Sequence, residues 1–132
     1  MPVEVHVVTP EREVWSGTAE MLIARGVDGE LGILGGHAPM MVQLAIGPLR
    51  IHPEGESSQE IRAVVDGGFM HVTSEGGETR VDVLANGAAL ADEIDLDAVR
   101  RRLEELRAAS DTEDDVLQSE VAKAEARINL AG

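Results

Sequence analysis

Apolar and polar residues alternate over short stretches through the first two thirds of the chain, a pattern typical of half-buried strands. Every second residue from Val3 to Val7 is valine, and similar runs rich in β-branched residues follow at intervals of roughly ten residues. Turn-forming residues separate these runs, as in Gly47-Pro48, Asp66-Gly67-Gly68 and Gly76-Gly77. The spacing predicts an antiparallel β-sandwich of about ten strands over residues 1–88.

The pattern changes after residue 88, where apolar residues recur every three or four positions, as on one face of a helix. The first such stripe consists of Leu96, Val99, Leu103 and Leu106, and the second of Leu117, Val121, Ala124 and Ile128. We expect Asp95 to cap the first helix, and Asp111 or Thr112 to cap the second. Residues 89–132 are therefore predicted to form an antiparallel helical hairpin, which makes the fold class α+β. Because each stripe is narrow, the hairpin should be marginally stable and its docking onto the sandwich separable.

Composition narrows the classes of function that this chain can serve. Its 132 residues, 43% of them hydrophobic, suffice for one modest core with an appendage. Trp15 and Phe69 are the only aromatic residues, so Val, Leu, Ile, Ala and Met must fill that core. The absence of cysteine excludes disulfides and thiolate metal sites. A formal net charge of −14 disfavours nucleic acid and anionic membrane surfaces, and the chain contains no apolar run long enough for direct membrane insertion.

The sequence shows no constellation of catalytic or metal-binding residues. No phosphate-binding glycine motif fits residues 26–36, and no Gly-x-Ser-x-Gly elbow is present. The four histidines lack the close spacing that places two imidazoles on one metal ion, which argues against a small enzyme of the cupin type. We therefore predict no catalytic residues and no metal site, and a non-enzymatic role.

The segment from Gly29 to Pro39 contains four glycines and one proline among core-type residues. Glycine reaches positive φ and permits close backbone approach, whereas Pro39 fixes its own φ and pushes Ala38 toward extended conformations. We interpret the segment as a strand that ends or bulges at a tight corner. The alternatives are an ordinary glycine-rich loop, or a ligand cleft in a small β-sandwich binding module of unrelated role.

A row of charged residues lies along one side of the first predicted helix. Asp97 and Arg100 are three residues apart, and Arg107 follows two turns further on. Such a row could present one carboxylate and two guanidinium groups to a nucleotide. The alternative is a solvated helix face with local ion pairs, such as Arg101 with Glu105.

The order of these motifs along the whole chain resembles the epsilon subunit of the bacterial rotary ATP synthase. The resemblance rests on Gly-Glu-Leu-Gly-Ile-x-x-Gly-His-Ala-Pro at 29–39, Gly47-Pro48-Leu49, Val65-Asp66-Gly67-Gly68-Phe69 and the C-terminal helix pair. It implies a ten-stranded β-sandwich that binds the gamma subunit of the central stalk and the membrane c-ring. It also implies a hairpin that reaches the catalytic beta subunits and brakes ATP hydrolysis, and a peripheral location on the cytoplasmic face of the cell membrane.

The same resemblance suggests which residues take part. Glu30, Gly36, His37 and Pro39 correspond to an interface with the ring and stalk. Residues 96–100 are similar to the family's Ile/Leu-Asp-x-x-Arg nucleotide motif, so Asp97, Arg100 and Arg107 become a candidate site for regulatory ATP, with no cofactor required. This chain departs from the family pattern at three positions, where Gly35 replaces a proline, Arg101 replaces an alanine and Ala91 replaces an acidic residue.

The second predicted helix is more acidic than the resemblance leads one to expect. Residues 110–132 contain two basic residues, Lys123 and Arg127, and six acidic ones. In the family this helix is often basic and meets an acidic segment of the catalytic subunit. Because like charges repel, we predict a weak brake, or one that relies on the arginines of the first helix.

Overall fold

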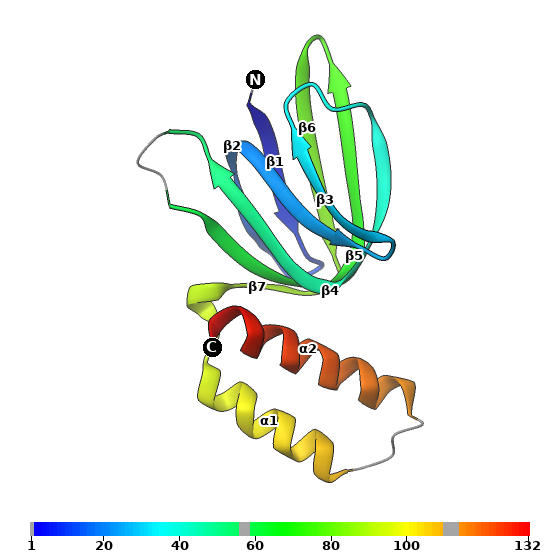
Figure 1. Ribbon diagram of the computed structural model, residues 1–132, viewed down its shortest axis with the longest axis vertical. Coiled ribbons are helices and arrows are strands. Elements are labelled where there is room, and N and C mark those ends of the chain that lie inside the picture. Colours follow the sequence, from blue (N-terminus) through cyan, green and yellow to red (C-terminus); the bar gives the residue numbers. More distant parts are fainter. Residues whose placement is uncertain (1, 56–58, 110–113) are drawn as a thin grey trace.

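The computed structural model describes residues 2–55, 59–109 and 114–132, and consists of a β-sandwich followed by two antiparallel helices (Figure 1). The strands are β1 (Val3–Val8), β2 (Glu13–Gly26), β3 (Gly29–Leu34), β4 (Met40–Pro53), β5 (Ile61–Glu75), β6 (Glu78–Ala85) and β7 (Ala88–Leu90). A 3-10 turn, η1 (Ala91–Glu93), leads into α1 (Leu96–Ala108) and α2 (Asp115–Ala131). The predicted α+β class is confirmed. β7 pairs with β5, so the proposed division after residue 88 falls within this strand.

The strands form one sheet that folds back on itself. Their order is β1-β6-β5-β4-β2-β3, and β1 also pairs with β2, which brings the two ends of the sheet together. The β1–β6 pair is parallel, and the other pairs are antiparallel. The closed path leaves β3 with one strand neighbour, β2, in the described part of the sheet.

The described residues form seven strands, so the prediction of about ten is too high. Two of the expected turns, Gly47-Pro48 and Asp66-Gly67-Gly68, lie inside the long strands β4 and β5. Gly67 and Gly68 have φ values of 85° and 127° where β5 passes from pairing with β7 to pairing with β6. Glycine here bends a continuous strand without ending it. Gly76-Gly77, by contrast, is the predicted hairpin turn between β5 and β6.

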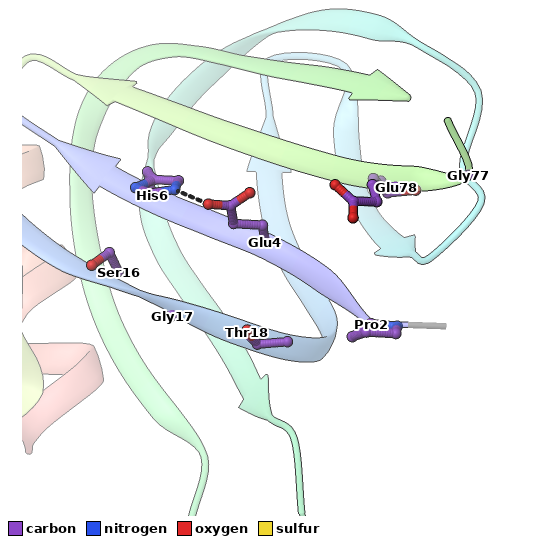
Figure 2. Close-up of a pocket in the computed structure, with 9 residues that line it drawn as sticks. Pro2, Glu4, His6, Ser16, Gly17, Thr18, Gly77 and Glu78 are labelled. Atoms are coloured by element: carbon purple, nitrogen blue, oxygen red, sulfur yellow. Dashed lines mark hydrogen bonds and ion pairs between the residues drawn. The ribbon is translucent and has the colours of Figure 1, made fainter. Parts of the chain in front are cut away.

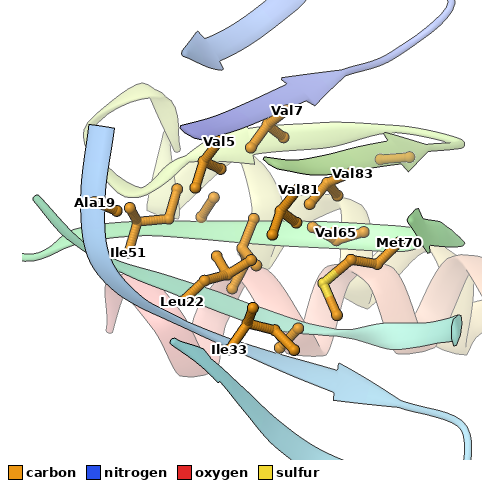
Figure 3. Packing of buried hydrophobic residues seen from close by; sticks show 14 of the residues in the cluster. Val5, Val7, Ala19, Leu22, Ile33, Ile51, Val65, Met70, Val81 and Val83 are labelled. Carbon is orange, nitrogen blue, oxygen red and sulfur yellow. The ribbon is translucent and has the colours of Figure 1, made fainter. Parts of the chain in front are cut away.

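The core lies between the two layers of the folded sheet and is aliphatic, as the composition predicts (Figure 3). Val5, Val81, Leu22, Ile33 and Met70 are fully buried there. Of the two aromatic residues, Trp15 packs against the edge of this core and Phe69 is exposed. Because β-branched side chains fit closely on a pleated surface, alternation along the strands is sufficient to build the core without large rings.

The helical hairpin packs on the end of the sandwich where β4 and β5 bend (Figure 1). Asp95 caps α1 as predicted, because its carboxylate accepts a hydrogen bond of 3.1 Å from the amide of Ala98. The predicted cap of α2 is wrong: Asp114 caps it, through the amides of Val116 and Leu117. Asp111 and Thr112 lie outside the described residues. Several residues that can cap a helix follow one another here, and the sequence does not specify which of them occupies the N-cap position. No helix in the described ranges is long and apolar enough to cross a membrane.

Candidate functional site

The corner from Gly35 to Pro39 lies at the end of the sandwich away from the helices, beside the β5–β6 turn (Figure 1). It is attached to that turn by two hydrogen bonds. The amide of Gly36 donates to Thr79 Oγ1 at 2.8 Å, and Ser74 Oγ donates to the carbonyl oxygen of His37 at 2.8 Å. Gly36 has a φ of 85°, a conformation that favours glycine. The glycine segment is therefore a strand followed by a fixed corner, as predicted.

His37 and Pro39 project from this corner with limited support from the rest of the chain. Nδ1 of His37 donates a hydrogen bond of 2.8 Å to the carbonyl oxygen of Ala38, since a carbonyl oxygen can only accept. This bond engages Nδ1 within the chain and leaves Nε2 as the ring nitrogen available to a partner. Pro39 and Gly36 are exposed. The corner thus offers an apolar ring and one imidazole nitrogen to a partner.

Glu30 lies at the opposite end of β3 from this corner. Its side chain is exposed and forms a long ion pair of 3.9 Å with Arg50 on β4. The structure therefore does not gather Glu30 and His37 into one pocket. Instead, Glu30 lies near the start of β3 and His37 lies just beyond its end. Only an extended partner surface could contact both residues at once.

An exposed apolar face, which sequence reasoning did not identify, covers the outer side of β4, β5 and β6. It consists of Val27, Met41, Phe69 and Leu84, with 54%, 63%, 49% and 51% of their surface exposed. Phe69 pairs directly with Leu84 on β6 and with Gln43 on β4, whose carbonyl oxygen accepts from the amide of Val27. The sequence signal that could have revealed this face is the presence of large apolar residues at strand positions where the alternation predicts outward-facing side chains. Exposed apolar side chains gathered on neighbouring strands are typical of protein interfaces.

The three candidate nucleotide residues lie on the exposed surface of α1. Arg107 forms an ion pair of 3.3 Å with Glu125 of α2, whereas Asp97 and Arg100 have no ion pair within the described ranges. The local pair that does form on α1 is Arg102 with Glu105, at 3.6 Å. The candidate residues do not line the crevice of about 420 Å³ between α1, α2 and β5. Their side of the helix is open to solvent.

A polar groove of about 460 Å³ crosses the outer face of β1, β2 and β6 (Figure 2). Glu4, His6 and Glu78 line it together with the hydroxyl groups of Ser16 and Thr18. Nε2 of His6 lies 2.9 Å from the Glu4 carboxylate, so the imidazole is engaged by this chain itself. Over the residues described, no group of three or more His, Asp and Glu side chains is arranged to hold a metal ion.

Comparison with known proteins places this geometry in a class. The described residues form a closed β-sandwich with a glycine corner, followed by a docked helical hairpin. Residues 2–91 match the family model described as ATP synthase, Delta/Epsilon chain, beta-sandwich domain. The chain belongs to this family of ATP synthase delta/epsilon chains.

Curated relatives agree with the family model over most of the chain. The ATP synthase epsilon chain of Thermobifida fusca is 43% identical over 129 residues, which cover 96% of this chain and 90% of that relative. The epsilon chain of Frankia casuarinae is 48% identical over 91 residues, which cover 68% of this chain and 99% of that relative. The second relative is therefore hardly longer than a sandwich.

Solved structures extend the similarity to three dimensions. A chain in the Euglena gracilis mitochondrial ATP synthase, a structure of OSCP, F1 and the c-ring, superposes with a TM-score of 0.73 and 29% identity. The match covers 93% of this chain and 76% of that one. A chain of the central stalk and c-ring of the Tetrahymena thermophila enzyme gives a TM-score of 0.58 at 15% identity and supports the fold alone.

Proposed function

We propose that this chain is a central-stalk subunit of a proton-translocating ATP synthase, where it couples the membrane c-ring to the catalytic head without performing chemistry itself. The observation that carries the proposal is the coexistence of an exposed apolar face and a hydrogen-bonded corner on one rigid sandwich. A coupling element needs two separate contact surfaces joined by a stiff body, and the continuous hydrogen-bonded sheet supplies that body. Family membership supports the same role.

Each surface suits a different partner. Phe69 and its apolar neighbours fit the gamma subunit of the stalk, because large apolar contacts support a long-lived attachment. The row from Glu30 to the corner at His37 and Pro39 fits the c-ring, whose rotation requires a contact that cannot deform. In the proposed role, the protein lies peripherally at the cytoplasmic face of the cell membrane.

The hairpin is the proposed regulatory part, which inhibits ATP hydrolysis by contact with the catalytic beta subunits. Both cations of α2 are engaged within this chain: Lys123 pairs with Glu120 at 3.1 Å, and Arg127 pairs with Asp66 at 2.7 Å. These pairs support a weak brake, since they leave neither cation of α2 unpaired to meet an acidic partner. Asp97 and Arg100, which are open to solvent, are the proposed contacts for regulatory ATP.

The test is the recovery of partners by a tagged chain from membranes that contain the ATP synthase. We expect the stalk and catalytic subunits to be recovered with the parent chain, and their amounts to fall at least tenfold with Phe69→Ser. Val116→Ser, which removes an exposed apolar residue from α2, is the control. Recovery of neither stalk nor catalytic subunits would favour the unrelated binding module.

A further inference from the structure

One ion pair between the hairpin and the sandwich differs from the others in geometry and burial. Arg127 on α2 donates two parallel hydrogen bonds to the carboxylate of Asp66 on β5, of 2.7 and 2.8 Å. The side chains of Asp66 and Arg127 are 11% and 20% exposed, whereas both partners of every other Arg–carboxylate pair between described residues lie nearer to solvent. A two-point, partly desolvated pair of this kind is stronger than a surface pair.

The sandwich fixes the backbone at Asp66 and leaves room for its carboxylate. Asp66 lies at the bend of β5, where its amide donates a hydrogen bond of 2.8 Å to the carbonyl oxygen of Gly87. A Cβ atom on Gly87 would come within 2.6 Å of Asp66 Oδ2, so glycine leaves the room that this carboxylate occupies. On the helix, Arg127 also donates to the carbonyl oxygen of Lys123 at 3.1 Å, which orients its guanidinium. Both partners are therefore preorganised.

Apolar packing supports this docking only in part. Of the described residues of α2, Ala124 is buried, and Val121, Ile128 and Leu130 are half-buried. Crevices of about 420 and 330 Å³ flank α2, the first toward α1 and β5 and the second toward the bend at Gly47-Pro48. A second polar contact joins Arg62 to the carbonyl oxygen of Leu130 at 3.0 Å, at an exposed position. Directional polar contacts therefore add to an apolar contact that is incompletely buried.

The linker before α1 is fixed separately. Glu93 of η1 accepts two hydrogen bonds from Arg12, in the turn between β1 and β2. Ile94 and Asp95 are the two residues between η1 and α1. Loss of the contact at Asp66 would therefore leave η1 on the sandwich and allow rotation about residues 94–95.

We infer that Asp66 and Arg127 form a latch that keeps the hairpin docked, and that its opening releases α1 and α2 together as a unit. Arg107 and Glu125, which join the two helices, stay paired in the released hairpin. Asp66 occupies the x position of the Val-x-Gly-Gly-Phe segment. One partner of the latch therefore lies in the same motif as the two glycines that form the bend of β5. The regulatory consequence rests on the function proposed above: the latch withholds Arg127 from the catalytic subunits.

Paired spin labels on the isolated full-length chain test the latch directly. The chain has no cysteine, so Glu78→Cys on the sandwich and Glu104→Cys on α1 introduce two unique label sites at exposed positions. Distance distributions are measured for the parent, Asp66→Ala, Arg127→Ala and the double variant. Arg101→Ala, which removes one exposed cation from α1, is the matched control.

We expect each single variant to raise the ratio of undocked to docked hairpin at least roughly tenfold, and the double variant to do no more than either single one. Arg127→Lys keeps the charge and loses the two-point geometry, so its ratio of undocked to docked hairpin should lie between those of the parent and Arg127→Ala. Unchanged distributions in Arg127→Ala, or effects that multiply in the double variant, overturn the latch. If Asp66→Ala does not fold, the distance distributions of Arg127→Ala and Arg127→Lys alone test the latch. Because no partner is present, this result is independent of the recovery experiment.

Discussion

Arg12 and Glu93 form a two-point ion pair between the β1–β2 turn and η1, with N–O distances of 2.8 and 2.7 Å. The same carboxylate accepts a hydrogen bond of 2.8 Å from the amide of Leu90. These hydrogen bonds, that from Arg12 foremost, hold the pKa of Glu93 below its ordinary value of 4.5. The junction between sandwich and hairpin is therefore stabilised by an ionised carboxylate.

This relationship predicts a pH dependence. Because the pKa of Glu93 is lower in the folded state, its contribution to stability is complete above about pH 4.5 and is lost as the pH falls through the folded-state pKa. We expect Glu93→Gln to lower the free energy of unfolding slightly at neutral pH, and the difference from the parent to vanish in acid. Denaturant unfolding followed by Trp15 fluorescence measures it. A difference that grew on acidification would contradict this account.

The apolar face predicts variants that lose binding and keep their stability. Leu84→Ser and Met41→Ser should weaken association with the stalk at least tenfold, because both side chains are about half exposed or more in the free chain and become buried only in a complex. Their unfolding free energies should change by less than about 1 kcal/mol. Titration against purified stalk subunits, with thermal unfolding measured in parallel, separates the two effects. Equal loss of binding and stability would assign these residues to the fold.

The open side of α1 predicts weak nucleotide binding. Calorimetric titration with ATP should give heats that Arg100→Ala reduces severalfold, since this guanidinium has no ion pair to break in the described structure. Arg102→Ala removes an arginine already paired with Glu105 and serves as the control. Identical heats for parent and Arg100→Ala would remove Arg100 from the nucleotide site.

Two strand glycines predict opposite outcomes for the same substitution. Gly68→Ala should destabilise the chain by about 2–4 kcal/mol, because φ is 127° and a Cβ would overlap the carbonyl oxygen of Leu84. Gly32 has ordinary extended backbone and nothing nearer than 4.0 Å to its would-be Cβ, so Gly32→Ala should be neutral or stabilising by up to about 1 kcal/mol. Urea unfolding of both variants measures this contrast. Similar losses of unfolding free energy in the two variants would contradict the prediction.

Removal of residues 93–132 should leave a folded sandwich. The core residues lie on β1 to β7 and their neighbours, and the Frankia casuarinae relative is spanned almost completely by 91 aligned residues. Circular dichroism and amide exchange of the truncated chain should show the sheet intact, with some loss of stability because Glu93 and Arg127 no longer tie down the surface. A chain that lost its cooperative unfolding would show that the hairpin is part of the core.

Strand boundaries show where sequence reasoning stopped short. Gly76-Gly77 and Gly67-Gly68 look alike as dipeptides, yet one is a hairpin turn and the other a bend inside β5. The difference depends on which strands lie alongside, namely β7 before the bend and β6 after it. The apolar face was missed for a similar reason, because the sequence does not show which face of the sheet Phe69 occupies, whereas its pairing with Leu84 and its exposure do.

The sequence by itself determined the sandwich, the hairpin, the cap at Asp95 and the family, because alternation, helical periodicity and local turn chemistry act between residues close together in the chain. The tertiary structure alone decided that Asp66 meets Arg127 across 61 positions, and that Glu30 and His37 mark opposite ends of β3. Such contacts arise from the packing of whole elements against one another, and no short-range pattern encodes them.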